Sequence, residues 1–468
     1  MNSDSGHALV IGSSMAGLLA ARVLAQHFGR VTLVDRDRES LSPDPRRGVP
    51  QGRHAHVLLK AGADILEQLF PGLWVDMHHK GSVEVDLGAD LAWFHYGVWK
   101  SRAHAGVEMH CQSRPFLEWQ VRERVRALPG VEVIADTSVE SLRYDRERGR
   151  VIGVSLRGRD QAAEAAPREL LADLVVDASG RGTATPRWLA ELGYPAPAED
   201  VVATDVRYAS RVMRLPADLE RDWKCLVIYP RAPRQTRVGY IFPNQDGTHL
   251  ITLAGYCGDA PPLDEAGFAA FARSLPRPEL WQAIARAEPL SPLKSHRLPS
   301  NLWRRYDRMA RFPDGYLVVG DAVCSFNPLF GQGISTAGFD ALALSDQLSE
   351  SGAAGFAASG SARRFQRRLV AGKRQAWILA TTEDLRYPQV TGKRPPGLSV
   401  LNWYKSHFLE GATDPVLNRA FLQVLTFQRG LDAMMTPGVV ARVMARAARG
   451  SMRRLFKREV ASSRAAPS

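Results

Sequence analysis

Cysteine is scarce in this sequence, and long apolar runs are absent. The 4 cysteines include no C-x-x-C pair, which argues against a zinc site or a disulfide framework and predicts reduced thiols. They are Cys111, Cys225, Cys257 and Cys324. No apolar run approaches the length of a membrane span, and the first one, Ala8 to Ile11, is too short for the core of a signal peptide. We therefore expect a cytoplasmic protein.

Acidic residues are fewer than basic ones, and the formal net charge is +12. Such an excess can indicate a nucleic-acid partner. Residues 442–464 alone carry eight basic side chains against one acid, so the remainder of the chain carries only +5, and we expect no nucleic-acid partner. From Val439 to Lys457, apolar side chains and arginines fall on different faces of a predicted helix. That pattern is compatible with weak contact to an anionic membrane surface, although a solvated terminal helix is the commoner explanation.

The first 35 residues predict a strand, a glycine-bounded turn, a helix and a second strand. The strands are His7 to Ile11 and Arg30 to Asp35, and the helix is Met15 to His27. This order gives a parallel βαβ unit with the turn at the carboxyl edge of the first strand, where ligands bind. A Rossmann-type domain is therefore predicted. Further along, we expect a helix over residues 116–128 and buried strands over Val131 to Ile134 and Ala172 to Val176.

The middle of the chain, Val201 to Gly258, alternates apolar and polar positions in short runs separated by turns, which predicts an antiparallel sheet. A strand over Tyr316 to Val319 returns to the buried pattern of the first domain, and the chain beyond Ala337 has an almost entirely helical pattern. We therefore expect an α/β protein with an inserted substrate domain. The expected limits are 1–200 and 296–345 for the Rossmann-type domain, 201–295 for the antiparallel-sheet substrate domain and 346–468 for a helical C-terminal region.

The turn G-S-S-M-A-G, Gly12 to Gly17, carries the first and last glycines of the dinucleotide fingerprint, with Ser14 in place of the middle glycine. These glycines permit a tight turn and close packing of helix on strand, and the free N–H groups of the helix N-terminus attract a diphosphate. Asp35 stands where an acid accepts a hydrogen bond from a ribose hydroxyl. A helix-capping glycine pair with a solvated acid is the alternative. The residues predicted to bind the cofactor here are Gly12, Ser13, Ser14, Met15, Ala16, Gly17, Asp35 and Arg36.

A second motif, G-D-A-V-C-S-F-N-P-L-F-G-Q-G-I, begins at Gly320 directly after the strand Y-L-V-V. An acid at a strand end, followed by a proline and two glycines that open a helix, supplies a hydroxyl acceptor and a second group of free backbone donors. A single phosphate needs no such second site, so the ligand is expected to be larger. The binding residues predicted here are Asp321, Pro328, Gly331, Gly333 and Ile334.

Together the two motifs resemble those of the FAD-dependent monooxygenases of the aromatic-hydroxylase and squalene-epoxidase type. The resemblance implies that the Rossmann-type domain binds FAD, with Asp321 at the ribityl chain and Pro328 and Gly331 to Ile334 bordering the isoalloxazine. The stretch S-R-P-F-L-E-W matches an arginine of that family at the start of a helix, which implies Arg114 against the FAD diphosphate; a surface arginine is the alternative. The stretch D-A-S-G-R-G around Asp177 matches a third family element approximately.

Further stretches narrow the resemblance to bacterial epoxidases that act on linear polyenes in polyether-antibiotic assembly. They are R-R-G-V-P-Q-G-R-H-A-H-V-L-L from Arg46, G-Y-C-G-D-A-P-P from Gly255 and A-W-I-L-A-T-T-E-D-L-R-Y-P from Ala376, with the D-A-S-G-R-G stretch. This resemblance implies a secondary-metabolism monooxygenase that epoxidises an alkene in an apolar polyketide or terpenoid through a peroxyflavin. O₂ is the implied co-substrate, and NAD(P)H or a partner flavin reductase supplies the electrons. Because the cofactor performs that chemistry, no catalytic residue is named.

Three other functions stay open. An aromatic or polyketide hydroxylase would use the same scaffold. A flavin-dependent halogenase is disfavoured, because none of the 10 tryptophans forms the W-x-W-x-I-P stretch in which such halogenases resemble one another. A non-catalytic flavin-binding protein would hold FAD without oxidising NAD(P)H.

The substrate side of the site is predicted only in outline. Four aliphatic and aromatic positions of the inserted sheet suit a broad apolar cavity: Val227, Tyr229, Tyr240 and Phe242. Sheet faces of that composition also occur in an ordinary hydrophobic core.

Four histidines need a separate interpretation. By the resemblance, His54 and His56 line the edge of the flavin or substrate cavity, with ordinary loop histidines as the alternative. Together with His78 and His79 they are candidate metal ligands. An H-x-H pair on a strand, without supporting carboxylates or a third placed ligand, instead predicts that no metal is bound.

Overall fold

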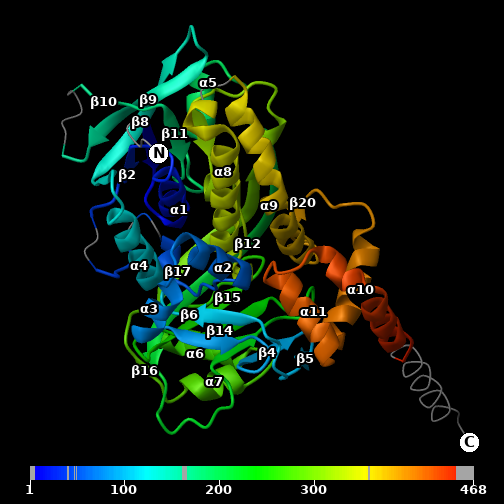
Figure 1. The fold of residues 1–468 in the computed structure, drawn as a ribbon. Coiled ribbons are helices and arrows are strands. Elements are labelled where there is room, and N and C mark those ends of the chain that lie inside the picture. Colours follow the sequence, from blue (N-terminus) through cyan, green and yellow to red (C-terminus); the bar gives the residue numbers. More distant parts are fainter. Residues whose placement is uncertain are drawn as a thin grey trace, which may run out of the picture.

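The computed structural model (Figure 1) describes residues 6–39, 42–46, 48, 50–160, 166–356 and 359–449. Its first sheet is five-stranded and entirely parallel, in the order β18-β11-β1-β2-β7. The strands are β1 (His7–Ile11), β2 (Arg30–Val34), β7 (Val131–Ile134), β11 (Leu174–Asp177) and β18 (Tyr316–Val318). The central strands are almost wholly buried, as parallel strands covered on both faces must be. The predicted Rossmann-type architecture is confirmed.

Local signals set the ends of the helices in this domain. Helix α4 (Arg114–Arg126) begins two residues earlier than predicted, because Ser113 Oγ accepts the backbone N–H of Phe116 at 3.3 Å and Pro115 occupies the first turn. Helix α1 (Met15–Leu24) ends three residues before the predicted end at His27, because the N–H groups of Gln26 and His27 donate to carbonyls only three residues back. Between β7 and β11 the chain forms a three-stranded antiparallel sheet that the sequence patterns did not predict. Its strands are β8 (Thr137–Asp145), β9 (Arg150–Gly158) and β10 (Arg168–Leu171).

A second, larger sheet has ten strands, in the order β19-β17-β12-β15-β14-β13-β4-β5, with β16 and β20 also pairing with β12. The predicted segment supplies β12 (Glu199–Arg214), β13 (Cys225–Ile228), β14 (Arg237–Pro243) and β15 (His249–Gly255), which pair antiparallel. The other strands are β4 (Leu91–His95), β5 (Val98–Trp99), β16 (Glu288–Pro289), β17 (Lys294–Arg304), β19 (Cys324–Ser325) and β20 (Thr391–Gly392). The sheet therefore extends beyond the expected limits of 201–295, because strands far along the chain complete it.

Strand β4 is the clearest difference from the sequence-based boundaries. It lies within residues 1–200, yet it pairs in parallel with β13 in the substrate sheet. All five of its residues are buried, and such a continuous apolar run has no alternation to mark it as a strand. A two-stranded ribbon of β3 (Val83–Asp86) and β6 (Glu108–Cys111) flanks this part of the chain.

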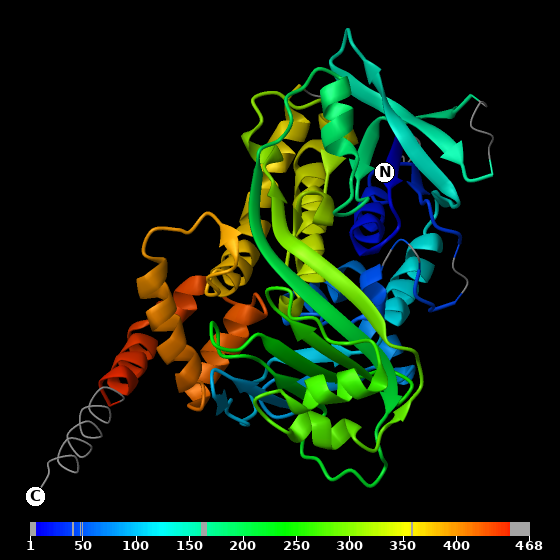
Figure 2. The ribbon, with the colours of Figure 1, turned by 180° about the vertical axis from the view of Figure 1, so that it is seen from behind.

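The two faces of the large sheet have different neighbours. Alternate residues of a strand point to opposite faces, and in β13 Leu226 and Ile228 pack with Phe268 and Phe271. Helices α6 (Glu265–Arg273) and α7 (Glu279–Ile284) thus cover the outer face (Figure 2). Val227 belongs to a separate cluster on the inner face.

From Gly333 to residue 449 the described part of the chain is mostly helical, as predicted. Helices α8 (Gly333–Gly355) and α9 (Ser361–Asp384) pack on each other and on the parallel-sheet domain, whereas α10 (Leu398–Gly411) and α11 (Pro415–Leu425) lie beside β4 and β5 (Figure 1). The remaining helices are α2 (Lys60–Leu69), α3 (Leu73–His79) and α5 (Thr185–Glu191).

A last helix occupies residues 437–449, where Arg442 pairs with Asp414 at 3.0 Å and Met444 is exposed. The segment beyond residue 449 lies outside the described residues, so membrane-surface contact by the basic tail stays a prediction. Within the described part of the chain, no helix combines the length and the apolar character needed to cross a bilayer.

Candidate functional site

The two glycine motifs, about 300 residues apart in the chain, meet at the carboxyl edge of the parallel sheet. Gly12 has φ +97°, and a Cβ atom there would come within 2.8 Å of the carbonyl oxygen of Ala178. A Cβ at Gly17 would lie 1.9 Å from the carbonyl oxygen of Gly12, so only glycine lets α1 approach β1 this closely. A Cβ at Gly320, φ +62°, would lie 2.7 Å from Cβ of Ala16. The motifs therefore form two sides of one site.

Asp35 accepts hydrogen bonds from the first glycine turn. Its Oδ2 accepts hydrogen bonds from the backbone N–H and the hydroxyl of Ser13 and from Arg46 Nη1 at 2.9 Å. Burial alone would raise its pKa, but the Arg46 charge and these hydrogen bonds hold the pKa of Asp35 below its usual value. The carboxylate is thus ionised and positioned at the end of β2. Arg36, the next residue, is exposed and contacts no described residue through a hydrogen bond or ion pair, so its role stays a prediction.

A group of three arginines surrounds Glu118 beside this turn. The carboxylate of Glu118 lies 2.6 Å from Arg46, 2.9 Å from Arg114 and 2.6 Å from Arg122, and it accepts the Ser14 hydroxyl at 2.8 Å. Ser14 therefore caps no backbone N–H of α1, which leaves the first turn of that helix open to a ligand. Arg46 also lies 3.9 Å from Asp37, so the three guanidinium groups face three carboxylates. The feature that suits a diphosphate is the open N-terminus of α1 with these guanidinium groups beside it.

The sequence-based prediction included Arg114 but missed Arg46, Glu118 and Arg122. Two signals could have found them. Arg114, Glu118 and Arg122 are spaced four residues apart on α4, so they share one helix face. Arg46 opens one of the stretches that carry the family resemblance.

Asp321 follows β18 in a short 3-10 turn and is half-buried. Its carboxylate has no hydrogen bond to any described residue, so both oxygens are available to a ligand hydroxyl. Burial raises its pKa, and the charges of Lys373, Arg181 and Arg114 partly offset that rise. The preceding Gly320 N–H donates to Asp340 Oδ2 at 2.7 Å, which fixes the turn.

The second glycine turn leads into α8. Pro328 begins a 3-10 turn, Gly331 has φ +65°, and Gly333 has no heavy atom within 4 Å of an added Cβ. The Gln332 side chain is 1% exposed, yet neither its amide nitrogen nor its amide oxygen has a hydrogen-bond partner. Ile334 is buried against the core. An open helix N-terminus and an unpaired buried amide are what a bound flavin ring would satisfy.

These residues fit FAD. The ionised Asp35 suits a ribose, the arginines and the open turn of α1 suit a diphosphate, and the free Asp321 suits a ribityl hydroxyl. Gly333 leaves room for a ring system, and Gln332 offers it unpaired donors and an acceptor. When bound, FAD would supply the redox chemistry.

A network of hydrogen bonds fixes the P-L-F-G turn, Pro328 to Gly331, on the side of the large sheet. The hydroxyl of Tyr229 donates to the carbonyl oxygen of Leu329, and the hydroxyl of Tyr240 donates to that of Tyr229 at 2.8 Å. Asn327 donates to the Asp384 carboxylate at 3.0 Å. Tyr229 directly follows β13, Tyr240 lies on β14 and Asp384 ends α9. The substrate sheet and the C-terminal helices thus position the turn together.

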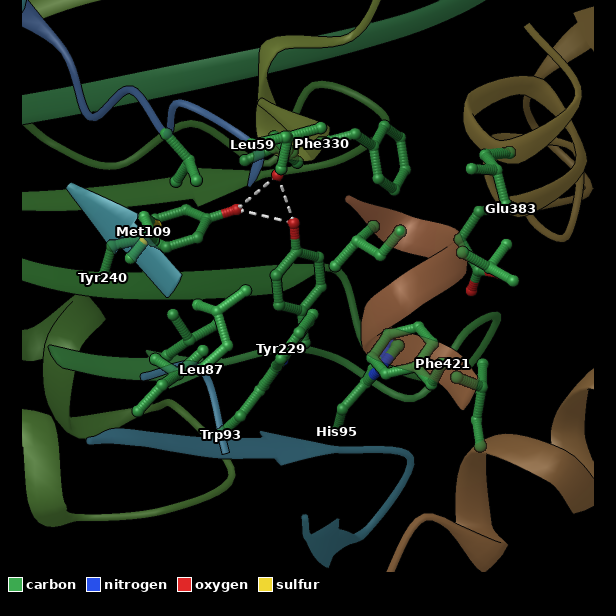
Figure 3. A pocket seen from close by; sticks show the side chains of 18 of the residues that line it. Leu59, Leu87, Trp93, His95, Met109, Tyr229, Tyr240, Phe330, Glu383 and Phe421 are labelled. Carbon is green, nitrogen blue, oxygen red and sulfur yellow. Dashed lines mark hydrogen bonds between the residues drawn. The ribbon is translucent and has the colours of Figure 1, made fainter. Parts of the chain in front are cut away.

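An apolar cavity of about 110 Å³ lies directly against this turn (Figure 3). Leu329 and Phe330 of the turn line it, and its walls come mainly from β4, β13, β14, α9 and α11. The four residues predicted from the inserted sheet line it: Val227, Tyr229, Tyr240 and Phe242. The lining residues that sequence reasoning missed are chiefly those of β4 and the C-terminal helices, among them Trp93, His95, Glu383, Lys405 and Phe421.

His54 and His56 do not line this cavity, although their neighbour Val57 does. The expected strand at H-x-H is absent, because Ala55 N–H donates to the Thr252 hydroxyl at 3.1 Å rather than to a neighbouring strand. His54 bonds Ser210 at 2.8 Å. His56 is half-buried with Nε2 unpaired, and burial together with the Arg114 charge lowers its pKa to about 3. His56 thus lies close to the cofactor site as a neutral ring.

His78 lies beside two residues that the sequence analysis did not connect with it. It lies with His110 and Glu84 in a group whose ligand atoms are all within 4.8 Å of one another. Glu84 and His110 are directly opposed on β3 and β6, and His78 and His110 share a hydrogen bond of 3.0 Å between ring nitrogens. That hydrogen bond accounts for the closeness of the two rings.

Comparison with known proteins agrees with this geometry. Residues 6–358 match the family described as FAD binding domain. Protein Rv3254 of Mycobacterium tuberculosis is 33% identical over 458 residues, which cover 95% of this chain and 94% of that protein. Kynurenine 3-monooxygenase of Salinispora tropica is 27% identical over 368 residues, 74% of each chain.

Among solved structures, the flavin-dependent brominase Bmp2 superposes with a TM-score of 0.65 at 16% identity, covering 90% of this chain and 93% of that one. A likeness at that identity shows the fold alone. The match over most of the chain shows more: the chain belongs to the FAD binding domain family, among the FAD-dependent monooxygenases and hydroxylases.

Proposed function

We propose that this protein transfers one oxygen atom from O₂ to an apolar organic substrate, and that its reaction is the epoxidation of an alkene in a polyketide or terpenoid. The observation that carries the proposal is the position of the cavity. An apolar space lies directly against Leu329 and Phe330, the turn beside which the isoalloxazine is expected. A substrate there would be close to the flavin and shielded from water.

The chain's own residues supply position and exclusion of water. Aromatic and aliphatic walls orient a substrate by shape, since few polar groups line the cavity. The hydroxyl protons of Tyr229 and Tyr240 are committed to the turn rather than to a substrate. Alkene epoxidation needs no proton removed from the substrate, so this lining suits it. The sequence resemblance to polyene epoxidases supports the same reaction.

Hydroxylation of an aromatic ring is the second candidate. It is favoured by the relative named kynurenine 3-monooxygenase and by the six aromatic rings that line the cavity, which can stack on a ring substrate. Halogenation has weaker support, because the likeness to Bmp2 concerns the fold and the W-x-W-x-I-P stretch is missing. The electron donor, NAD(P)H or a partner reductase, stays a prediction.

The test is incubation of the FAD-loaded protein with ¹⁸O₂, with NADH, NADPH or a flavin reductase, and with a panel of linear polyenes and phenols. One ¹⁸O atom in an epoxide supports the proposal. If ¹⁸O appears only in a ring-hydroxylated product and every alkene is unchanged, the reaction is hydroxylation and not epoxidation. Flavin that is reduced and reoxidised with no labelled product from the panel contradicts both.

A cavity-filling variant tests whether the product forms in this cavity or through flavin chemistry elsewhere. Val227→Trp is expected to remove product formation while FAD remains bound, because Val227 lines the cavity and not the cofactor site. Val201→Trp is the matched control, since Val201 is exposed. Equal product from both variants would show that the substrate binds elsewhere.

A further inference from the structure

His95 is a cavity-lining side chain whose polar atoms are uncommitted. It lies on β4, is 6% exposed, and reaches toward the cavity beside Phe421 (Figure 3). Its Nδ1 is fully buried without a hydrogen-bond partner, and neither ring nitrogen bonds to a residue that the structure describes. A buried polar group left unpaired costs free energy, so a partner for this ring is expected to come from outside the chain.

The tyrosine hydroxyls and the charged groups of the lining are already paired. The hydroxyls of Tyr229 and Tyr240 serve the carbonyl oxygen of Leu329. The Glu383 carboxylate accepts the hydroxyl of Tyr96 at 2.8 Å and lies 2.9 Å from Lys405 Nζ. The imidazole is therefore the lining group most free to bind a ligand.

Trp93 adds a second unpaired polar atom on the same wall. It stands two residues before His95 on β4, so both side chains point to one face of the strand. Their rings are stacked, with centroids 5.8 Å apart and planes within 9°. The indole Nε1–H, which can only donate, has no partner.

We propose that Trp93 and His95 form a polar end of the cavity that binds a hydroxyl group of the substrate. The inference rests on the proposed function, and it assigns the substrate class: an apolar molecule with an alcohol or phenol hydroxyl at one end.

The charges favour a hydroxyl over an ionised group. Burial, together with the charge of Lys100, holds the pKa of His95 well below its usual value, so the ring is neutral and offers one donor and one acceptor. Despite burial, the charges of Lys405 and Arg386 hold the pKa of Glu383 at about 2. The Glu383 carboxylate lies 2.9 Å from Lys405 and 3.7 Å from Arg386, so Lys405 is already paired. A carboxylate or an ammonium group would lose hydration without meeting an unpaired counter-charge among the lining side chains. A hydroxyl both donates and accepts, which matches the neutral ring.

The experiment compares three probes that share a 4-ethylphenyl group, on the FAD-loaded protein. They are 4-ethylphenol, 4-ethyltoluene, in which a methyl group of similar size replaces the hydroxyl, and 4-ethylbenzoate, in which a carboxylate replaces it. Binding is followed by the change in the flavin absorption spectrum, which requires no turnover. We expect 4-ethylphenol to bind roughly fivefold to tenfold more tightly than 4-ethyltoluene, the range for one hydrogen bond. We expect 4-ethylbenzoate to bind more weakly than 4-ethylphenol.

Variants test whether His95 causes the preference for 4-ethylphenol over 4-ethyltoluene. His95→Phe keeps a ring but loses both nitrogens and is expected to abolish the preference for 4-ethylphenol. His95→Gln keeps a donor and an acceptor and is expected to retain part of it. His79→Phe, at an exposed histidine outside the cavity, is the control and is expected to change nothing. FAD content, measured for each variant, identifies one that fails to fold, and His95→Gln then carries the test.

An equal preference in wild type and His95→Phe would overturn the inference. So would the absence of any preference in wild type, including failure of all three probes to bind, or tighter binding of 4-ethylbenzoate. Failure of the proposed function has a different outcome: 4-ethylphenol would bind with the expected preference, but ¹⁸O₂ would label no product.

Discussion

The ammonium group of Lys373 lies 2.7 Å from the carboxylate of Asp340, and both side chains are almost completely buried. Asp340 Oδ2 also accepts the N–H of Gly320, the residue before Asp321. This ion pair between α9 and α8 therefore supports the turn that presents Asp321 to the cofactor.

Lys373→Met is expected to lower the free energy of unfolding by about 3–5 kcal/mol, because it leaves a buried carboxylate unpaired. It is also expected to reduce FAD retention. Thermal unfolding and the FAD-to-protein ratio measure the two effects. Arg374→Met, at an exposed position on the same helix, is the control. The double variant with Asp340→Asn is expected to be more stable than Lys373→Met alone, and a purely additive loss would contradict the coupling.

The purified protein is expected to contain FAD rather than FMN or NAD, because one motif suits an adenosine diphosphate and the other a ribityl-flavin. Cofactor released by acid and separated chromatographically identifies it. Recovery of FMN, or no flavin after reconstitution, would show that the two motifs do not act as one site.

Asp321→Ala is expected to weaken FAD binding by roughly 1.5–3 kcal/mol, the range for a hydrogen bond to a charged group. The carboxylate has no protein partner to lose, so thermal stability of the FAD-free protein should change little. The affinity is measured by titrating FAD into the FAD-free protein. An unchanged dissociation constant would remove Asp321 from the site.

Gly17→Val is expected to prevent FAD retention by separating α1 from β1, since even a Cβ would lie 1.9 Å from the carbonyl oxygen of Gly12. Gly182→Ala is the matched control, because an added Cβ there meets no atom within 4 Å. The FAD-to-protein ratio after purification is the measurement. Full FAD content in Gly17→Val would refute the close approach of helix and strand.

Asp384 is expected to make stability depend on pH. Burial raises the pKa of its carboxyl to about 7, although hydrogen bonds from Asn301 and Asn327 oppose the rise. The folded state therefore binds a proton more tightly than the unfolded state, and this contribution to stability is lost as the pH rises from about 4 to about 7. Urea unfolding at pH 5 and pH 7.5 measures it. Asp384→Asn is expected to have a smaller difference between the two pH values than wild type, and an equal difference would contradict the assignment.

Much of the fold and of the cofactor site follows from short-range patterns. The βαβ order, the two glycine turns and the acids at strand ends are each local, so they are visible in the sequence. The alternation that puts Val227 on the inner face of β13, and Tyr229 just after the strand on the same side, is equally local, and both residues line the cavity. The strand predicted at the H-x-H stretch is absent, because the backbone N–H of Ala55 donates to the side chain of Thr252, nearly 200 residues away.

The fold class and the FAD motifs can be predicted from short stretches of the sequence, because helical and strand periodicities and glycine conformations depend on residues close together in the chain. The surroundings of these motifs follow from tertiary packing. Arg46 reaches Glu118, Asp340 pairs with Lys373, and β4 joins a sheet more than 100 residues away along the chain. His95 likewise meets the Glu383 and Lys405 pair only because α9 and α10 close the cavity. Such contacts depend on how separate elements pack, and no local periodicity records that packing.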